Sequence, residues 1–335
     1  MLPFFVYNFY VTVSSLILTN SIKMDNKIKL IFYGTPDIAA RCLQALVEDD
    51  SFEVLAVVTQ EDKPVGRKQI MTAPPVKVYA EGQGISAHQP EKLGSEDSLF
   101  EELSSLGADY NVVVAYGQMM PQRFLDFPRL RSVNLHVSLL PAYRGASPMQ
   151  EALKNGDSVT GVTVQEMALK MDRGPILGVE EIVITPDDTI FELYEKSGLV
   201  GADLLKRILK EDFSEAGNEG NISPTLQDES KASYCSKITK KDGEIDFTVM
   251  TAGEVYNKYR AYKMWPGIYS FWNGKRVKLT EVKISEDTGS GVAPGAWGKD
   301  KDRLFVKCKD GVIEILRCQL EGKKEMSVAE VLRGM

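Results

Sequence analysis

The sequence predicts an α/β domain built on a mostly parallel sheet, followed by a small β-barrel domain. The chain has 335 residues, about twice the usual size of one domain, so two domains are expected. Between residues 28 and 210, short β-rich apolar runs alternate with amphipathic helical stretches, the pattern of parallel strands joined by helices. After residue 231 the pattern changes to strands separated by hairpin turns. Hydrophobic residues make up 43% and charged residues 26% of the chain, which excludes a disordered or low-complexity protein.

The first domain is expected to carry its functional site at one edge of the sheet. The β-rich runs lie at residues 54–59, 110–115, 133–137 and 162–167, and the helical stretches at 39–47, 76–80, 99–106 and 149–153. The first turn reads Gly34-Thr-Pro36 and not G-x-G-x-x-G, so a tightly held dinucleotide is not indicated. Open sheets of this type bind ligands at the carboxyl ends of their strands. The loops that follow the strands are therefore the place to look for chemistry.

The chain begins with an apolar leader, residues 1–23, which has no charged residue up to Ile22. A strand pattern starts soon after Met24, and polar residues interrupt the leader, so we interpret the leader as an extension upstream of the true start. A targeting peptide is the alternative. The protein is accordingly expected in the cytoplasm without a stable membrane partner, or in an organelle if the leader is a targeting segment.

Three further segments follow the leader. Residues 24–210 form the first domain, and residues 211–230 are polar and turn-rich, which predicts a linker. Residues 231–335 form the second domain, where Asn273-Gly274 and Asp310-Gly311 are signals for two-residue hairpin turns. These strands fit a barrel of the oligonucleotide-binding (OB) kind, although other small barrels share the same pattern.

Charge is distributed unevenly along the chain. The formal net charge is −7, but residues 231–335 carry +6 and the remainder −13. A basic domain on an acidic body is the asymmetry expected when the partner is a polyanion. A small domain kept soluble by lysines would give the same balance.

Cysteines and histidines are few. None of the four cysteines lies in a C-x-x-C pair, so neither a disulfide scaffold nor a cysteine zinc site is expected. Since only two histidines are present, His88 and His136, we expect no metal in the site.

Asn134 and His136 are the first candidates for catalysis. They are two positions apart on a predicted strand, so both side chains project from the same face. A carboxamide beside an imidazole at a strand end can donate to a developing oxyanion and move a proton. The alternative is a buried histidine satisfied by a backbone carbonyl, with Asn134 as a strand-end cap.

Asp172 is the third candidate, on a loop between a predicted strand and Gly174-Pro175. A carboxylate near His136 would favour the imidazolium form and fix the position of the ring proton. The alternative is an Asx-turn, a common use of aspartate before glycine. The sequence alone does not show that Asp172 and His136 meet in space.

Four motifs of the first domain resemble the formyltransferases that use 10-formyltetrahydrofolate. They are Gly34-Thr-Pro36, Asn134-x-His136-x-Ser138-Leu-Leu-Pro-x-Tyr-Arg-Gly145, Thr160-Gly-Val-Thr163 and Asp172-x-Gly-Pro-Ile-Leu177. Three tail motifs are similar to the members of that family that formylate the methionine carried by initiator tRNA: Tyr234-x-x-Lys-Ile-x-Lys-x-Asp-Gly-x-Ile-Asp246, Arg260-Ala-x-x-x-Trp-Pro-Gly267 and Gln319-Leu-Glu-Gly-Lys-Lys324. The resemblance extends from about residue 28 to the C-terminus.

The resemblance implies a Rossmann-like formyltransferase domain followed by a tRNA-binding barrel. It implies a catalytic trio of Asn134, His136 and Asp172, with 10-formyltetrahydrofolate as co-substrate and initiator methionyl-tRNA as partner of a monomer. The implied folate-binding turn consists of Ser138, Leu139, Leu140 and Pro141. Ala168, Leu169 and Lys170 stand where the family often has aspartate and glycine, which leaves the geometry of the Asp172 loop open.

The long loop between Gln60 and Pro75 matches a family insertion that reaches the acceptor end of tRNA. Its basic residues Lys63, Arg67 and Lys68 are the implied tRNA contacts. A solvated surface segment is the alternative, although loops of this length in compact domains are usually functional or disordered.

Two other functions remain to be weighed against this one. The first is the same folate chemistry on another acceptor, such as an amino sugar, a ribonucleotide amine or water, which would not need the lysine-rich tail motifs. The second is a non-catalytic folate- or RNA-binding module, which would be expected to lose Asn134, His136 or Asp172.

Overall fold

The computed structural model describes residues 27–333 except 67, 96, 288–290 and 301. The leader, residues 1–23, and the predicted tRNA contact Arg67 therefore lie outside the described residues. Within the described part, no helix combines the length and the apolar character that crossing a bilayer requires.

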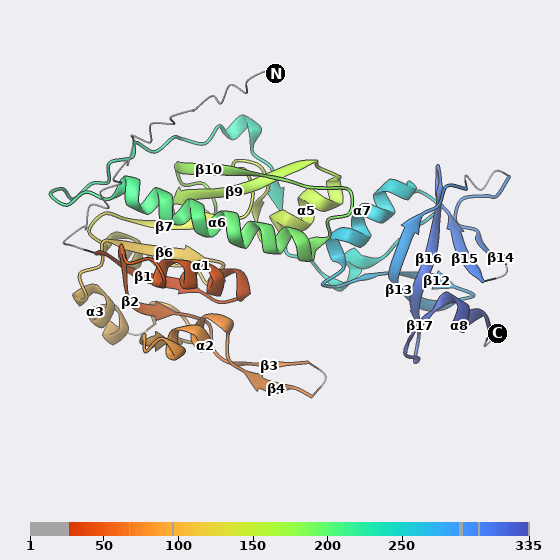
Figure 1. The fold of residues 1–335 in the computed structure, drawn as a ribbon, viewed down its shortest axis with the longest axis horizontal. Coiled ribbons are helices and arrows are strands. Elements are labelled where there is room, and N and C mark those ends of the chain that lie inside the picture. Colours follow the sequence, from red (N-terminus) through yellow and green to blue (C-terminus); the bar gives the residue numbers. More distant parts are fainter. Residues whose placement is uncertain (1–26, 67, 96, 288–290, 301, 334–335) are drawn as a thin grey trace, which may run out of the picture.

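The first domain is built on a seven-stranded sheet in the order β10-β9-β7-β6-β1-β2-β5 (Figure 1). Its strands are β1 (Ile28–Gly34), β2 (Phe52–Val58), β5 (Ala87–His88), β6 (Tyr110–Val114), β7 (Arg131–His136), β9 (Val159–Glu166) and β10 (Ile176–Val183). The pairings from β5 to β7 are parallel, whereas β9 and β10 add an antiparallel edge. The mostly parallel sheet predicted from the sequence is confirmed.

Helices cover both faces of this sheet. They are α1 (Asp37–Val47), α2 (Pro75–Gly82), α3 (Asp97–Ser105), α4 (Gln122–Asp126), α5 (Pro148–Asn155) and α6 (Ile190–Asp212). Alternation along β1 shows the two layers: Leu30 and Phe32 pack in one core with α1 and α6, and Ile31 and Tyr33 pack in the other with α3 and α4. Such continuous apolar strands are typical of a sheet buried on both sides.

The second domain is an antiparallel sheet with one helix before it and one after it. Its elements are α7 (Ala252–Tyr262), β12 (Ile268–Trp272), β13 (Lys275–Ile284), β14 (Trp297–Asp300), β15 (Arg303–Lys307), β16 (Val312–Leu320), β17 (Glu325–Ser327) and α8 (Val328–Arg333). The strands pair in the order β12-β13-β16-β15-β14, with β17 on β16. Trp272 of β12 stacks on Trp297 of β14 with the ring centroids 5.5 Å apart, so side chains draw the two edge strands together.

The two predicted hairpins of this domain differ in their turns. Asn273 and Gly274 both have positive φ, at 49° and 75°, and connect β12 to β13 as a two-residue turn. Between β15 and β16 the last pair is Lys307 with Val312, so the second turn spans residues 308–311 and is longer than predicted.

The segment between the domains does not run free of the first domain. After α6 it returns along β10, as Figure 1 shows, and Thr225 exchanges two backbone hydrogen bonds with Ile176. It contains η1 (Glu229–Lys231), β11 (Tyr234–Cys235) and η2 (Lys240–Gly243), and β11 pairs with β8 (Arg144–Gly145). This return path brings residues beyond α6 next to the loops at the carboxyl ends of the strands.

The predicted loop between Gln60 and Pro75 contains a small β-hairpin. Strands β3 (Lys63–Val65) and β4 (Ile70–Thr72) pair with each other and project away from the sheet (Figure 1). Gly66 and Gln69, with φ of 72° and 49°, supply the left-handed conformations that close its turn.

Candidate active site

A cavity of about 690 Å³ opens where β6, β7 and β9 meet the loops at one edge of the first sheet. Asn134, His136 and Asp172 all line it. The structure therefore brings together the three candidate side chains, which come from two separate motifs.

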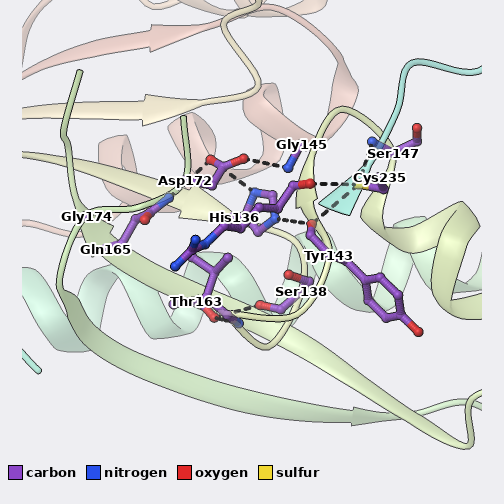
Figure 2. A network of polar contacts seen from close by, with 12 residues as sticks. His136, Ser138, Tyr143, Gly145, Ser147, Thr163, Gln165, Asp172, Gly174 and Cys235 are labelled. Carbon is purple, nitrogen blue, oxygen red and sulfur yellow. Dashed lines mark hydrogen bonds and ion pairs between the residues drawn. The ribbon is translucent and has the colours of Figure 1, made fainter. Parts of the chain in front are cut away.

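His136, the last residue of β7, is buried, and a polar group of the protein faces each of its ring nitrogens (Figure 2). Its Nε2 lies 3.0 Å from the carbonyl oxygen of Tyr143, and its Nδ1 lies 3.6 Å from Oδ1 of Asp172. Since a carbonyl only accepts hydrogen bonds, Nε2 carries the proton of the neutral ring and Nδ1 faces the carboxylate. The alternative interpretation was a buried histidine satisfied by a backbone carbonyl. Nε2 does have such a carbonyl, but Nδ1 faces the carboxylate of Asp172, which lines the cavity.

Asp172 is fixed by groups that lie outside its own loop. Its Oδ2 accepts a hydrogen bond from the backbone N–H of Gly145 at 2.8 Å, and its Oδ1 accepts one from Nε2 of Gln165 at 3.2 Å. The carboxylate thus bonds other elements and not its own loop, which argues against the Asx-turn. With both oxygens held by donors, Oδ1 stays directed at His136.

The loop that carries Asp172 is tight. Asp172 has φ of 53°, a left-handed conformation that is costly for a residue other than glycine. A Cβ at Gly174 would lie 1.7 Å from the carbonyl oxygen of Glu166. Such strained backbone, over-determined by its surroundings, is typical of functional loops.

Asn134 lies two residues before His136 on β7 and is half-buried. Within the described residues its carboxamide makes no hydrogen bond to protein, although it lines the cavity. Its N–H₂ group is therefore available to a ligand, the property that an oxyanion donor needs.

The predicted folate-binding turn does not line this cavity. Ser138 donates through Oγ to the carbonyl of Ala142 at 2.6 Å. Thr163 of β9 donates through Oγ1 to the carbonyl of Ser138 at 2.6 Å and accepts from the N–H of Leu140 at 3.1 Å. Hydrogen bonds to Thr163 therefore hold this turn against β9. The turn follows His136 directly and stabilises the end of β7; it consists of Ser138, Leu139, Leu140 and Pro141.

The rest of the cavity wall is mostly apolar. It includes Tyr116, Met119 and Met120 after β6, and Met167 and Met171 around the Asp172 loop. A cavity of this size, with mostly apolar walls and a few polar side chains, is typical of a small-molecule site. Among the described residues, no group of three or more metal-ligating side chains gathers.

Three residues of the site were not found from the sequence. Gln165 lies opposite Asn134 in the antiparallel pairing of β7 with β9, and it donates to Asp172 of the loop that follows β9. Gln227 and Lys237 come from the segment beyond α6, the first through hydrogen bonds to the Asp172 loop and the second by lining the cavity. Only the path of that segment reveals them.

Cys235 is buried beside the histidine. Its Sγ lies 3.4 Å from the carbonyl oxygen of Tyr143, the same oxygen that accepts from His136. Burial raises the pKa of the Cys235 thiol, so the group remains protonated and donates to this carbonyl.

Two of the basic residues predicted to contact tRNA, Lys63 and Lys68, lie away from the cavity, on the β3–β4 hairpin. Lys63 and Lys68 are both exposed there, and Lys63 donates to the side-chain carbonyl of Gln60. Exposed apolar side chains accompany them, Val65, Ile70 and Met71. A projecting hairpin of this kind is available to a partner.

The chain belongs to the formyltransferase family. The family model described as formyl transferase matches residues 26–209, and the model described as formyl transferase, C-terminal domain, matches residues 237–335. The methionyl-tRNA formyltransferase of Caldicellulosiruptor saccharolyticus is 42% identical over 307 residues, covering 91% of this chain and 96% of that protein. The enzyme of the same name from Bdellovibrio bacteriovorus is 38% identical over 312 residues, covering 92% of this chain and 96% of that protein.

Solved structures share the fold at lower identity. WlaRD, a sugar 3N-formyltransferase solved with dTDP and 5-N-formyl-THF, matches with a TM-score of 0.62 and 19% identity over 89% of this chain and 100% of its own. HypX from Aquifex aeolicus, in complex with tetrahydrofolic acid, matches with a TM-score of 0.61 and 17% identity, covering 92% of this chain and 47% of its own. These likenesses support the α/β fold class.

Proposed function

We propose that this protein transfers the formyl group of 10-formyltetrahydrofolate to the α-amino group of the methionine carried by initiator tRNA. The observation that carries the proposal is the convergence of Asn134, His136 and Asp172 in one cavity of a formyltransferase domain. The relatives that are 37–42% identical over about nine-tenths of the chain are named for this acceptor, methionyl-tRNA.

In this reaction the α-amine forms a bond to the formyl carbon, and the bond from that carbon to the folate nitrogen breaks. The formyl oxygen carries negative charge in between, and the amine must lose a proton. The free carboxamide of Asn134 donates to that oxygen. A protonated His136 donates to it through Nδ1, because Nε2 is already bonded to the carbonyl of Tyr143. Asp172 holds the imidazole in place and helps to take the surplus proton, directly or through a water.

The apolar wall of the cavity is proposed to hold the pterin ring. The turn of Ser138, Leu139, Leu140 and Pro141 would then act on the folate by shaping the end of β7, in addition to any direct contact.

The division of labour between the domains is part of the proposal. Residues 24–210 carry the chemistry, residues 211–230 lead to the second domain, and residues 231–335, with their charge of +6, bind tRNA together with Lys63, Arg67 and Lys68. We propose a monomer that acts in the cytoplasm, or in an organelle if residues 1–23 are a targeting segment. Sequencing the N-terminus of the native protein distinguishes these two cases.

An amino sugar is the competing acceptor, because a sugar N-formyltransferase shares the fold. The basic second domain and the relatives named for methionyl-tRNA favour the tRNA acceptor. A formylation assay with charged initiator tRNA, elongator methionyl-tRNA and a free amino sugar compares the candidates directly. Preferred formylation of the sugar would refute the proposed acceptor.

Three substitutions test the catalytic roles: Asn134→Ala, His136→Ala and Asp172→Asn. Each is expected to lower kcat by about 10²–10³-fold, because each removes an oxyanion donor or a group that moves a proton. Filter binding of charged tRNA should give a nearly unchanged Kd, since none of the three lies on the hairpin or in the second domain. Near-normal turnover in all three variants would contradict the assignment.

A further inference from the structure

Gln227, in the segment between the domains, is hydrogen-bonded to the backbone of the Asp172 loop. Gln227 donates through Nε2 to the backbone carbonyls of Gly174 at 2.7 Å and Asp172 at 2.9 Å. The same nitrogen lies 3.2 Å from Oε1 of Gln165. An amide nitrogen has two hydrogens, so the two short bonds use them and the third contact is shared.

The other end of this amide is held just as firmly. Oε1 of Gln227 accepts from Nε of Arg144 at 3.0 Å and from Nη2 at 2.8 Å. Arg144 is only 1% exposed and also forms a two-pronged ion pair with Glu229. Since Oε1 meets only donors and Nε2 only acceptors, the orientation of the amide is fixed.

These bonds continue to the carboxylate. Gln165 receives the shared contact from Gln227 through Oε1 and donates through Nε2 to Oδ1 of Asp172. Gly145, the residue after Arg144, donates its backbone N–H to Oδ2. Both ends of the network therefore lead to the oxygens of Asp172, and Oδ1 lies 3.6 Å from His136.

We propose that Gln227 is a positioning residue for Asp172: clamped by Arg144, it holds the strained Asp172 loop in the conformation that directs the carboxylate at His136. The inference rests on the proposed function, because it assigns Gln227 a part in that reaction. It also means that the segment leading to the second domain completes the active site of the first.

The most informative substitution is Gln227→Glu. The carboxylate still accepts from Arg144, so the hydrogen bonds between residue 227 and Arg144 are retained. A carboxylate cannot donate, so the hydrogen bonds to the carbonyls of Asp172 and Gly174 are lost. Misplacement of a catalytic group by about 1 Å can lower a rate by about 10²-fold. We expect kcat to fall by about 10- to 100-fold, with both KM values within about twofold of the wild type.

Asn221→Asp is the matched control. Asn221 lies in the same segment and donates through Nδ2 to a backbone carbonyl, that of Phe213, so the substitution makes the same amide-to-carboxylate change away from the site. Its kcat should be unchanged. Gln227→Met, which loses both the donor and the acceptor, should lower kcat at least as much as Gln227→Glu.

A double-mutant cycle separates positioning from general damage. If Gln227 acts through Asp172, Gln227→Glu should lower the rate by less than about twofold when Asp172→Asn is already present. An equal loss in both backgrounds, or wild-type kcat for Gln227→Glu alone, would overturn the inference. Absence of formylation by the wild-type enzyme would instead overturn the proposed function.

Hydrogen exchange tests the same inference without any turnover. The N–H of Gly145 is protected by Oδ2 of Asp172, so it should exchange faster in Gln227→Glu and in Asp172→Asn but not in Asn221→Asp. Unchanged protection of Gly145 in Gln227→Glu would show that Asp172 keeps its place without the clamp.

Discussion

Gly174 shows at the scale of one residue how tightly the Asp172 loop is built. A Cβ at this position would meet the carbonyl carbon of Glu166 at 2.8 Å and its oxygen at 1.7 Å, and neither is the movable end of a side chain. The loop can therefore turn back against β9 only with glycine here.

Gly174→Ala is expected to displace this loop. We expect a loss of about 1–3 kcal/mol in the free energy of unfolding, because the backbone must shift. We also expect a fall in kcat larger than the change in either KM, because Asp172 moves with the loop. Chemical denaturation and steady-state kinetics measure the two effects.

Gly82→Ala is the control for this substitution. Gly82 is the last residue of α2, its new Cβ would meet nothing within 4 Å, and its φ is not left-handed. Both stability and kcat should stay close to the wild type. A Gly174→Ala enzyme that behaves in the same way would show that the loop tolerates movement.

At the scale of one element, the β3–β4 hairpin is the contact with tRNA that we propose for the first domain. Among the strands that the structure describes, the hairpin pairs with no other, and its lysines Lys63 and Lys68 and its apolar side chains are exposed. Exposed lysines next to apolar side chains suit a ligand that presents both phosphates and bases.

Replacement of Lys63, Arg67 or Lys68 by alanine should weaken tRNA binding mainly through lost phosphate contacts. Each lysine or arginine that neutralises a phosphate contributes about one unit to the slope of log Kd against log salt concentration. We expect each substitution to lower that slope by about one unit, with kcat at saturating tRNA nearly unchanged. Filter binding across a salt series measures the slope.

Lys206→Ala provides the comparison. Lys206 lies on α6, where its ion pair with Asp203 closes within one helical turn. Its removal should leave the salt slope as it is. If the hairpin variants and Lys206→Ala give the same slope as the wild type, the hairpin does not contact the tRNA backbone.

At the scale of the whole molecule, buried hydroxyl and thiol groups limit stability at alkaline pH. Burial raises the pKa of Tyr143 and Tyr262 to about 12, and that of the Cys42 and Cys308 thiols also to about 12. Desolvation by burial raises the pKa values of Tyr33, Tyr110 and Tyr116 further still. In the unfolded chain these groups would titrate near their ordinary values, about 8.5 for cysteine and about 10 for tyrosine.

The native state therefore holds these protons more tightly than the unfolded chain does. Their contribution to stability is complete below about pH 8.5 and is lost as the pH rises towards 12, because unfolding then releases protons. We expect the Tm to fall increasingly steeply from about pH 9 to 11. A Tm that stays level to pH 11 would contradict this prediction.

Tyr116→Phe isolates one of these groups. Its buried hydroxyl has no hydrogen-bond partner among the described residues, so phenylalanine removes a titrating proton without breaking a bond. The variant should be as stable as the wild type at pH 8 and should lose less stability by pH 11. Thermal unfolding at the two pH values makes the comparison.

Much of the architecture could be predicted from the sequence because it depends on local periodicity. The helices found at α1, α2, α3 and α5 begin and end within about three residues of the amphipathic stretches. The antiparallel strand β10 escaped this pattern, since Gly178 and two glutamates interrupt its apolar run. A Cβ at Gly178 would lie 2.5 Å from Cδ1 of Ile208 on α6, so the helix packs closely over this strand, a constraint that the local pattern does not contain.

The sequence by itself determined the alternation of strands and helices in the first domain, the strand that carries Asn134 and His136, and the loop that carries Asp172. Periodicity and turn chemistry depend only on residues that are close together in the sequence, so these features can be predicted from the sequence alone. The tertiary structure alone decided that Asp172 faces His136, that Gln165 lies beside Asp172, and that Gln227 is hydrogen-bonded to the loop. Those contacts join residues as far apart as positions 144 and 227, and they depend on sheet register and on the path of the chain after α6, which no local pattern specifies.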